Sequence, residues 1–487
     1  MKHLIGETQV SAEDIRLIES ILSFKPTRIM INHLVKNCSK DGDSRVEVAL
    51  ELYSGNRRSA CFTCQHIVLP IVRRIMKKGS QVFQASEEKL KELFGQPHWR
   101  KGFTSMLKGM AKFGVKKPFT PGAPLLVVWD FTYKCNLKCK HCYSSSGKPK
   151  TSEMTTEEAL ETVKKLAEAD VSVVAFSGGE PLIRKDFFQV AKAAHDYGMY
   201  VAIATNATLI TREVARRLKE SGVSYAQISL DGATAKTHDS FRGVSGAFDQ
   251  TIKGIENCIE EGLFVEVATT ITKHNYKELR EIIELCRKMK VPWLMIYNFV
   301  PTGRGKEIIE LDLTPSEREK VLRELVTLTY MQSELTFLST APQYARVSLQ
   351  IAEEAKGGKL IMPTHFCNLP ATSEVMRIAD FIGGCGAGRM YCSLKPDGSI
   401  QPCVFLPIKV GNILKDDFEE LWENNKVFND LRDREKLKGT CRNCDYKYVC
   451  GGCRARAYAY FGDYLAPDPG CILNEQYWRE AIGNKYN

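Results

Sequence analysis

The chain lacks several features that would indicate its class directly. No stretch of its 487 residues reaches the ~18 consecutive apolar residues of a membrane-spanning helix. It has no low-complexity segment and no internal repeat beyond the strand and helix alternation described below. An apolar signal segment is missing from the N-terminus, although the chain holds 17 cysteines. Because disulfides belong to oxidising compartments, these absences predict a cytoplasmic protein whose thiols are kept for metals.

Acidic residues are scarce in one part of the chain. Between Glu51 and Thr120 there are 14 Lys and Arg but 4 Asp and Glu, an excess as large as the net charge of the whole chain, +10. This part contains two apolar stripes beside basic residues, namely Val68, Ile71, Val72, Ile75 and Met76, and then Phe103, Met106, Leu107, Met110 and Phe113. Basic amphipathic helices lie on anionic membranes or dock on a protein core. Peripheral membrane contact through residues 66–117 is therefore one prediction, whereas no repeat of aromatic and basic residues supports nucleic-acid binding.

The N-terminal region offers two further patterns. Apolar residues on one face of residues 12–23 predict a helix. Cys38, Cys61 and Cys64, with His66 close by, fit either a small metal site or buried free thiols. The role of this region is not apparent from its sequence.

The length predicts more than one domain, because a single core rarely grows past roughly 250–300 residues. We expect a basic, mainly helical region over 1–120, a barrel over 121–310, a helical bridging segment over 311–384 and a cysteine-rich extension over 385–487.

From residue 124 onwards, short apolar runs alternate with longer amphipathic ones. The runs predict strands at Leu125–Asp130, Val171–Phe176, Tyr200–Ala204, Tyr225–Leu230, Phe264–Thr269 and Trp293–Phe299. The segments between them predict helices at Thr156–Ala169, Lys185–Tyr197, Arg212–Ser221, Ala247–Glu261 and Tyr276–Lys288. Such β-α units form an α/β fold with a parallel sheet that curls towards a barrel, and its chemistry lies at the C-terminal ends of the strands.

Three cysteines follow the first of these strands. Cys135, Cys139 and Cys142 form a C-x3-C-x2-C motif. A [4Fe–4S] cluster normally takes four protein thiolates, so three closely spaced ones leave one iron open for another ligand. Zinc would need a fourth ligand within reach of this loop.

The second strand ends in the run Ser177-Gly-Gly-Glu-Pro181. Together with the three-cysteine motif, this run resembles the radical-SAM superfamily. The resemblance implies a partial (β/α)6 TIM-like barrel and S-adenosylmethionine (SAM) as the ligand of the open iron. It also implies SAM contacts at the strand ends, from Gly178, Gly179, Glu180, Asn206, Ser229, Asp231, Arg242, Thr270 and Tyr297. Turn capping and ordinary strand packing are the alternatives for the polar residues among them.

Eight more cysteines follow within 87 residues. This region is similar to the SPASM extension of radical-SAM enzymes, which implies two auxiliary [4Fe–4S] clusters and three clusters in all. The first would be held by Cys385, Cys392, Cys403 and Cys453, and the second by Cys441, Cys444, Cys450 and Cys471. A pair of zinc ribbons is the structural alternative.

The resemblance implies an oxidoreductase or maturase that cleaves SAM to a 5′-deoxyadenosyl radical and abstracts hydrogen from an unactivated C–H bond. The auxiliary clusters would accept the substrate electron, and a flavodoxin- or ferredoxin-type protein would donate electrons. We expect a peptide or protein side chain as the substrate, with a haem-type tetrapyrrole or a membrane lipid as alternatives. An iron–sulfur electron carrier is the non-enzymatic alternative. The sequence assigns no catalytic side chain.

Overall fold

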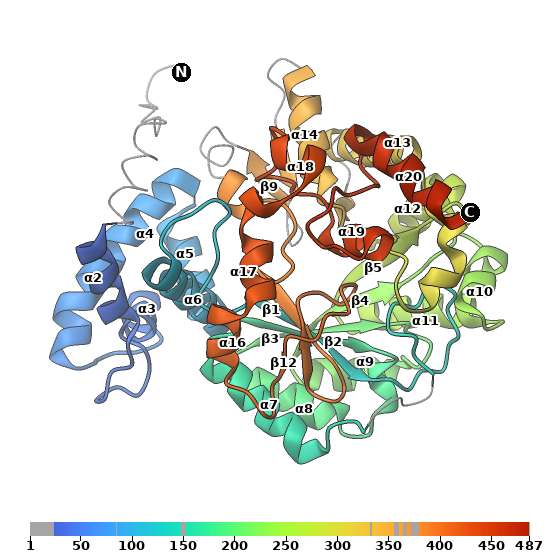
Figure 1. The fold of residues 1–487 in the computed structure, drawn as a ribbon. Helices are drawn as coiled ribbons and strands as arrows, with labels where there is room; N and C mark the ends of the chain where they lie inside the picture. The colour runs from blue at the N-terminus through green and yellow to red at the C-terminus, as the bar shows by residue number, and fades with distance from the viewer. Residues whose placement is uncertain are drawn as a thin grey trace, which may run out of the picture.

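A computed structural model describes residues 24–83, 85–147, 152–331, 334–354, 360–363, 368–371 and 379–486. The helix predicted over residues 12–23 lies outside these ranges. In the described part, no helix is both long and apolar enough to cross a membrane. Figure 1 shows the N-terminal helices gathered at one side of the sheet.

The centre of the structure is a parallel sheet, as predicted. Six strands follow one another in chain order and pair in parallel with their neighbours: β1 (Leu126–Thr132), β2 (Val173–Gly178), β3 (Tyr200–Thr205), β4 (Val223–Ser229), β5 (Phe264–Ile271) and β6 (Trp293–Asn298). The helices between them are α7 (Thr156–Glu168), α8 (Phe187–Asp196), α9 (Arg212–Glu220), α10 (Ala235–Arg242), α11 (Ala247–Glu260) and α12 (Leu279–Lys288), with short turns η2 (Pro181–Ile183) and η3 (Tyr276–Glu278). This α/β architecture is a partial TIM barrel.

The sheet extends beyond the six predicted strands at both edges. β7 (Thr336–Ser339) pairs in parallel with β6. At the other edge β10 (Tyr391–Leu394) pairs in parallel with β1, and the antiparallel strands β11 (Ser399–Gln401) and β12 (Gly411–Asn412) follow. The segment expected to be a helical bridge therefore adds a strand to the sheet, besides η4 (Gly303–Leu311), α13 (Pro315–Tyr330), α14 (Gln343–Glu354) and the hairpin β8 (Leu360–Pro363) and β9 (Asn368–Ala371).

Local sequence signals explain why these elements form where they do. Thr155 caps α7 by accepting a hydrogen bond from Glu158 N, and the Glu158 side chain accepts one from Thr155 N in return. This reciprocal capping satisfies two N–H groups at the start of the helix. Behind the sheet, the rings of Trp129, Phe131 and Phe176 pack against one another with centroids 5.2–5.6 Å apart. Their burial anchors the first two strands, which carry the predicted motifs.

The N-terminal helices form a separate small core. They are α2 (Lys25–Val35), α3 (Arg45–Ser54), η1 (Thr63–Val68), α4 (Leu69–Phe83), α5 (Glu87–Gly95) and α6 (Pro97–Phe113). Val68, Val72, Met76 and Leu107 from the two predicted apolar stripes are buried together in this core, and Phe103 packs against it. Several side chains of both stripes are therefore used within the protein, which favours the docking of α4 and α6 on a protein core. Membrane contact through residues 66–117 stays a prediction.

α6 attaches the N-terminal helices to the barrel. Lys108 Nζ lies 2.6 Å from Asp170 Oδ2, and Lys101 Nζ donates to Ala167 O at 3.0 Å. The ring of His98 lies 5.1 Å from that of Tyr200 at the start of β3. The N-terminal region therefore lies against the barrel at the N-terminal ends of its strands.

The C-terminal extension is joined to the barrel by a buried ion pair. Lys395 Nζ, in the turn between β10 and β11, lies 2.5 Å from Asp130 Oδ2 in β1. Asp130 also accepts a hydrogen bond from Tyr143 Oη at 2.7 Å. The rest of the extension is helical, with α16 (Phe418–Asn424), α17 (Lys426–Arg432), η5 (Arg434–Lys436), α18 (Gly439–Asn443), α19 (Arg454–Phe461), η6 (Ile472–Asn474) and α20 (Glu475–Tyr486).

Replacing Lys395 should weaken this junction strongly. Lys395→Met leaves the Asp130 carboxylate fully buried without its cation, and we expect a loss of about 3–5 kcal/mol in the free energy of unfolding. Denaturant unfolding measures it, with the exposed Lys253→Met on α11 as the control, where about 0–1 kcal/mol is expected. Equal losses in the two variants would contradict the importance of the buried pair.

Candidate functional site

A cavity of about 690 Å³ runs through the barrel interior. At the C-terminal ends of the strands it is lined by the three-cysteine loop and by Gly178 and Gly179. At the opposite ends it reaches Trp99 of α6 and the first residues of several strands, such as Tyr200 and Trp293. Its walls therefore come from the N-terminal helices, the barrel and the C-terminal extension.

The three-cysteine loop is held by backbone hydrogen bonds to its surroundings. Gly147 N donates to Tyr133 O at 2.8 Å, which closes the loop, and Lys138 N donates to Arg242 O at 3.1 Å. Arg304 N donates to Cys142 O at 3.0 Å. These bonds fix the loop at the C-terminal end of β1, where Cys135, Cys139 and Cys142 all line the cavity, as predicted.

Burial keeps two of these thiols protonated in the absence of a metal. It raises the pKa of Cys135 to about 12, and the nearby Glu180, Cys139 and Cys142 raise it further. Burial likewise raises the pKa of Cys139, although the Arg242 guanidinium opposes this. Thiols that share a cavity wall become thiolates when a metal group binds them. The donor set therefore fits an iron–sulfur cluster.

The two glycines after β2 allow the second motif to approach the cysteine loop. A Cβ atom on Gly179 would lie 2.0 Å from Lys134 O, and Gly178 has a φ of 113°, which favours glycine. Gly179 N donates to Thr132 O at 2.7 Å and Glu180 N donates to Lys134 O at 2.8 Å. The Gly-Gly turn is thus fixed directly against the residues that precede Cys135.

Glu180 is held by hydrogen bonds inside the protein. Its side chain is fully buried, and its oxygens accept hydrogen bonds from Thr205 Oγ1 at 2.9 Å and Asn206 N at 2.9 Å. Burial raises the pKa of this carboxyl group to about 7. It does not line the cavity, whereas Gly178 and Gly179 do. In this structure Glu180 therefore joins the β2 turn to the end of β3.

Asp231 is also used inside the protein. Its Oδ2 lies 2.6 Å from Arg242 Nη2, and its Oδ1 accepts a hydrogen bond from Thr270 N at 2.7 Å. Burial opposes ionisation of Asp231, but Arg242, His141, His238 and the Thr270 N–H together outweigh it and keep the pKa of the carboxyl group below its usual value. Asp231 is absent from the cavity wall, so it orients Arg242, which does line the cavity. Arg242 Nη1 lies 3.7 Å from Cys139 Sγ.

The structure brings the other predicted contacts together at the cavity wall, namely Asn206, Ser229, Thr270 and Tyr297. Asn206 Nδ2 donates to Asn136 Oδ1 at 2.9 Å and so joins the end of β3 to the cysteine loop.

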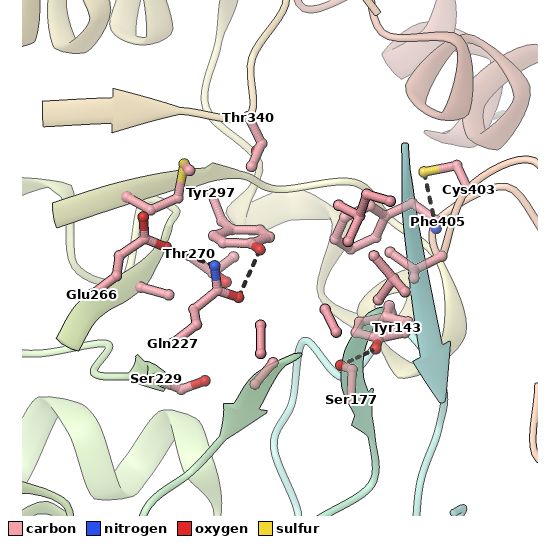
Figure 2. Close-up of a pocket in the computed structure, with 18 of the residues that line it drawn as sticks. Tyr143, Ser177, Gln227, Ser229, Glu266, Thr270, Tyr297, Thr340, Cys403 and Phe405 are labelled. Atoms are coloured by element: carbon pink, nitrogen blue, oxygen red, sulfur yellow. Dashed lines mark hydrogen bonds between the residues drawn. The ribbon is translucent and has the colours of Figure 1, made fainter. Parts of the chain in front are cut away.

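A polar chain along the cavity wall formed by β4, β5 and β6 was not predicted from the sequence. Tyr297 Oη donates to Gln227 Oε1 at 2.8 Å, and Gln227 Nε2 donates to Glu266 Oε1 at 2.6 Å (Figure 2). Gln227 and Glu266 lie inside their strands and not at the strand ends, where the predicted contacts lie. The alternation of side chains along β4 and β5 places both towards the interior. A polar residue at an inward position of a predicted strand was the sequence signal that could have identified them.

The C-terminal cysteines form two groups. In the first, Cys385, Cys403 and Cys453 all line the cavity and gather around Tyr391, which donates its hydroxyl to Cys403 Sγ at 3.0 Å. Figure 2 shows Cys403 near Phe405, whose N donates to Cys403 Sγ at 3.4 Å. Burial raises the pKa of Cys403 to about 11. This group faces the same cavity as the three-cysteine loop.

Cys392 does not join this group. It follows Tyr391 in β10, so its side chain points to the opposite face of the sheet. There it is fully buried in the main core with Ile400, Trp422 and Phe428. The assignment of Cys392 as a cluster ligand is therefore corrected, because the period of the strand turns it away from Cys403.

Cys441, Cys444, Cys450 and Cys471 form the second group. Burial raises the pKa of Cys450 well above its usual value, and the nearby Cys471 and Cys441 add to this. Burial also raises the pKa of Cys444, and the nearby Cys441 adds to this. Cys450 and Cys453 lie three residues apart but belong to different groups, so the two groups interleave in the chain.

Glu266 should make stability depend on pH. Burial raises its pKa to about 7, so between about pH 4.3 and 7 the folded protein holds a proton that the unfolded chain has lost. Stability should therefore fall by roughly 3–4 kcal/mol as pH rises through this window. Melting curves of Glu266→Gln should lack this component, while the exposed Glu256→Gln should behave like the unmodified protein. A profile unchanged in Glu266→Gln would contradict the prediction.

Comparison with known proteins agrees with this geometry. Residues 129–299 match the radical SAM superfamily, and residues 385–445 match an iron-sulfur cluster-binding domain, SPASM. The chain is 39% identical over 352 residues to an AdoMet-dependent heme synthase of Methanosarcina barkeri (strain Fusaro / DSM 804), with 72% of this chain and 97% of that protein covered. It is 32% identical over 356 residues to a mycofactocin maturase of Mycobacterium tuberculosis, with 72% of this chain and 83% of that protein covered.

A solved structure shares the fold. It is Streptococcus suis SuiB bound to the precursor peptide SuiA, with a TM-score of 0.61 at 19% identity, over 88% of this chain and 93% of that one. The relatives are named as synthases and maturases, so the chain is an enzyme and the electron-carrier alternative is set aside. The family implies SAM and iron–sulfur clusters as cofactors. The chain belongs to the radical SAM superfamily and carries a C-terminal SPASM domain.

Proposed function

We propose that this enzyme oxidises a side chain of a haem-type tetrapyrrole. The observation that carries the proposal is the 39% identity to a heme synthase, which spans 97% of that relative. The match covers 72% of this chain. The haem-type alternative from the sequence is thereby preferred to the peptide that we expected first.

Cys135, Cys139 and Cys142 would hold the cluster that binds SAM. Bound together, these cofactors supply the 5′-deoxyadenosyl radical, which removes hydrogen from an unactivated C–H bond. The SAM contacts would come from residues on the cavity wall, namely Gly178, Gly179, Asn206, Ser229, Arg242, Thr270 and Tyr297. Glu180 and Asp231 would position this wall through Asn206 and Arg242.

Cys385, Cys403 and Cys453 would hold one auxiliary cluster, and Cys441, Cys444, Cys450 and Cys471 the other. With the SAM cluster this gives three [4Fe–4S] clusters. Arg346 is buried, and its charge opposes the rise in the pKa of Cys450 and Cys471 that burial causes. It would offset the negative charge of the second site. The auxiliary clusters would take up the substrate electron, and a flavodoxin- or ferredoxin-type donor would supply electrons to the enzyme.

The cavity suits a flat conjugated ring. Tyr143 and Phe405 pack edge to face with centroids 5.2 Å apart, and the ring of Tyr297 lies 6.5 Å from that of Phe405. All three line the cavity beside the first auxiliary thiols (Figure 2). Aromatic side chains bury the face of a planar ligand, while the tyrosine hydroxyls provide polar contacts.

Haem chemistry accords with this arrangement. Converting a ring propionate into a vinyl group removes one hydrogen atom, one electron and carbon dioxide. A C–H bond beside the ring is broken first, the carboxylate carbon leaves as carbon dioxide, and an acceptor takes the remaining electron. The three-cysteine loop lines the same cavity as Cys403, which belongs to the proposed electron acceptor.

A peptide side chain is the second candidate. It is favoured by the 32% identity to a mycofactocin maturase over 83% of that protein. The two candidates share the same cofactors and differ in what enters the cavity.

Iron content tests the ligand assignment. Cys403→Ala should lower the iron of the anaerobically reconstituted protein by up to roughly one third, because it removes one of three thiolates from a cluster. Cys392→Ala should keep the full content, about 12 iron per chain by the four-iron arithmetic of such clusters. Equal losses in the two variants would contradict the assignment of Cys392 to the core.

A substrate assay tests the function. Iron coproporphyrin, a ring with propionate side chains, should lose carbon dioxide, one hydrogen atom and one electron per converted side chain when incubated anaerobically with the enzyme, SAM and a strong reductant. Counted for the free acid, the loss is carbon dioxide and two hydrogens, of which the second is the carboxyl proton. Mass spectrometry of the pigment and of 5′-deoxyadenosine measures both products. A candidate precursor peptide is incubated in parallel.

The controls separate cofactor loss from substrate choice. A Cys135→Ala, Cys139→Ala, Cys142→Ala variant should form no 5′-deoxyadenosine. Cys441→Ala should still cleave SAM but yield little modified product, because it weakens an electron acceptor. An unchanged tetrapyrrole in the presence of active SAM cleavage would overturn the proposed substrate, and a modified peptide would establish the second candidate.

A further inference from the structure

Four side chains of the N-terminal helices form a compact group of metal-ligating atoms. We propose that Cys38, Asp41, Cys61 and Cys64 bind one zinc ion. Their ligand atoms all lie within 4.8 Å of one another. The group lies outside both family matches, which cover residues 129–299 and 385–445, and it does not depend on the proposed function.

The backbone brings the four residues together from two segments. Between α2 and α3, a tight loop is closed by the bridge between Asn37 and Ser44, and Gly42 N donates to Cys38 O at 2.9 Å. This loop presents Cys38 and Asp41. Cys61 precedes η1, a π-helical turn that contains Cys64. Such turns are rare and are frequently found at functional sites.

The distances fit one ion. Cys38 Sγ lies 3.6 Å from Cys61 Sγ and 3.2 Å from Asp41 Oδ2. Tetrahedral zinc with bonds of about 2.3 Å to sulfur holds its sulfur ligands about 3.8 Å apart. In a [4Fe–4S] cluster the thiolates bind different irons and stand further apart. Among the described residues, the cysteines assigned to clusters do not form so tight a group. The closer spacing therefore distinguishes the proposed zinc site from the cluster sites of the same protein.

The donor chemistry favours zinc. Thiolates are soft ligands that select zinc, copper(I) or iron, and a carboxylate is accepted by zinc as a fourth ligand. Cys61 N donates to both oxygens of Asp41 at 3.2 Å, and Cys64 N lies 3.5 Å from Cys61 Sγ. Arg57 Nη1 lies 3.5 Å from Asp41 Oδ1 and offsets part of the negative charge. Four protein ligands complete the tetrahedron, which is typical of a structural site.

A histidine ligand and a disulfide both fit this group less well than zinc held by Asp41 and three thiolates. His66 is exposed and its ring packs against Phe62 with centroids 4.9 Å apart, so it takes no part in the group. A disulfide between Cys38 and Cys61 would involve neither the fully buried Cys64 nor the Asp41 carboxylate beside it. Asp41 was not among the residues that the sequence suggested, and it supplies the fourth ligand in place of His66.

The ion would fasten a small domain. Cys38, Val48 and Cys64 form a buried cluster separate from the main core of the N-terminal helices. A zinc ion there joins the loop after α2 to the start of η1, and metal binding of this kind contributes directly to folding. The ion would therefore stabilise the N-terminal helices, among which α6 contacts the barrel.

The full-length protein with its clusters in place tests the proposal. Elemental analysis after growth with zinc and removal of loose metal by a chelator should give about one zinc per chain in addition to the iron. X-ray absorption at the zinc edge should show sulfur at about 2.3 Å and oxygen at about 2.0–2.2 Å, in a ratio of three to one. Iron does not interfere with this edge.

Variants locate the ion. Cys61→Ser should lose the zinc and keep the iron and the cleavage of SAM, while His66→Ala, in the same segment, should keep all three. Should Cys61→Ser fail to fold, Asp41→Ala serves instead, because it leaves the thiols in place and should remove the protein oxygen from the zinc spectrum. Absence of zinc, zinc retained in Cys61→Ser, a sulfur-only zinc spectrum of the unmodified protein, or a Cys38–Cys61 disulfide in alkylation mass spectrometry would each overturn the proposal.

Discussion

The burial of Asp130 is the constraint that joins the parts of this enzyme. It lies in β1 just before the three-cysteine loop, and its carboxylate is fully buried. One partner is Tyr143, within that loop, and the other is Lys395, in the C-terminal extension. A buried carboxylate without these partners would be strongly destabilising. The cysteine loop and the extension therefore have to be in place together, which couples the SAM site to the auxiliary thiols.

The two-residue period of the strands decides which groups reach the cavity. Along β10 it directs Tyr391 towards the first group of auxiliary thiols and Cys392 into the main core. Along β4 and β5 it directs Gln227 and Glu266 inwards, where they meet Tyr297. The same rule thus removes one expected cluster ligand and adds two unexpected polar groups to the cavity wall.

Much of the fold could be predicted because it depends on local patterns. The six strands and the five predicted helices appear within a few residues of their predicted bounds, since apolar runs and amphipathic spacing are visible in the sequence. α10 (Ala235–Arg242) was not predicted. What depended on tertiary packing was not visible. The apolar stripe with Val72 predicts a helix but does not indicate what the helix packs against. The sequence likewise does not show that the Glu180 side chain is fully buried. The sequence does not distinguish Asp41 from the other carboxylates, because only the folded loop brings it to Cys61.

The N-terminal helices contribute to the cavity wall together with the rest of the enzyme. His98 and Trp99 of α6 line it at the end opposite the three-cysteine loop, beside Tyr200. The heme synthase of Methanosarcina barkeri matches 72% of this chain while 97% of that protein is covered, so this chain holds a long segment with no counterpart there. A ligand that fills this end of the cavity meets α6 as well as the barrel. The N-terminal helices therefore form the wall of the cavity at the end opposite the three-cysteine loop.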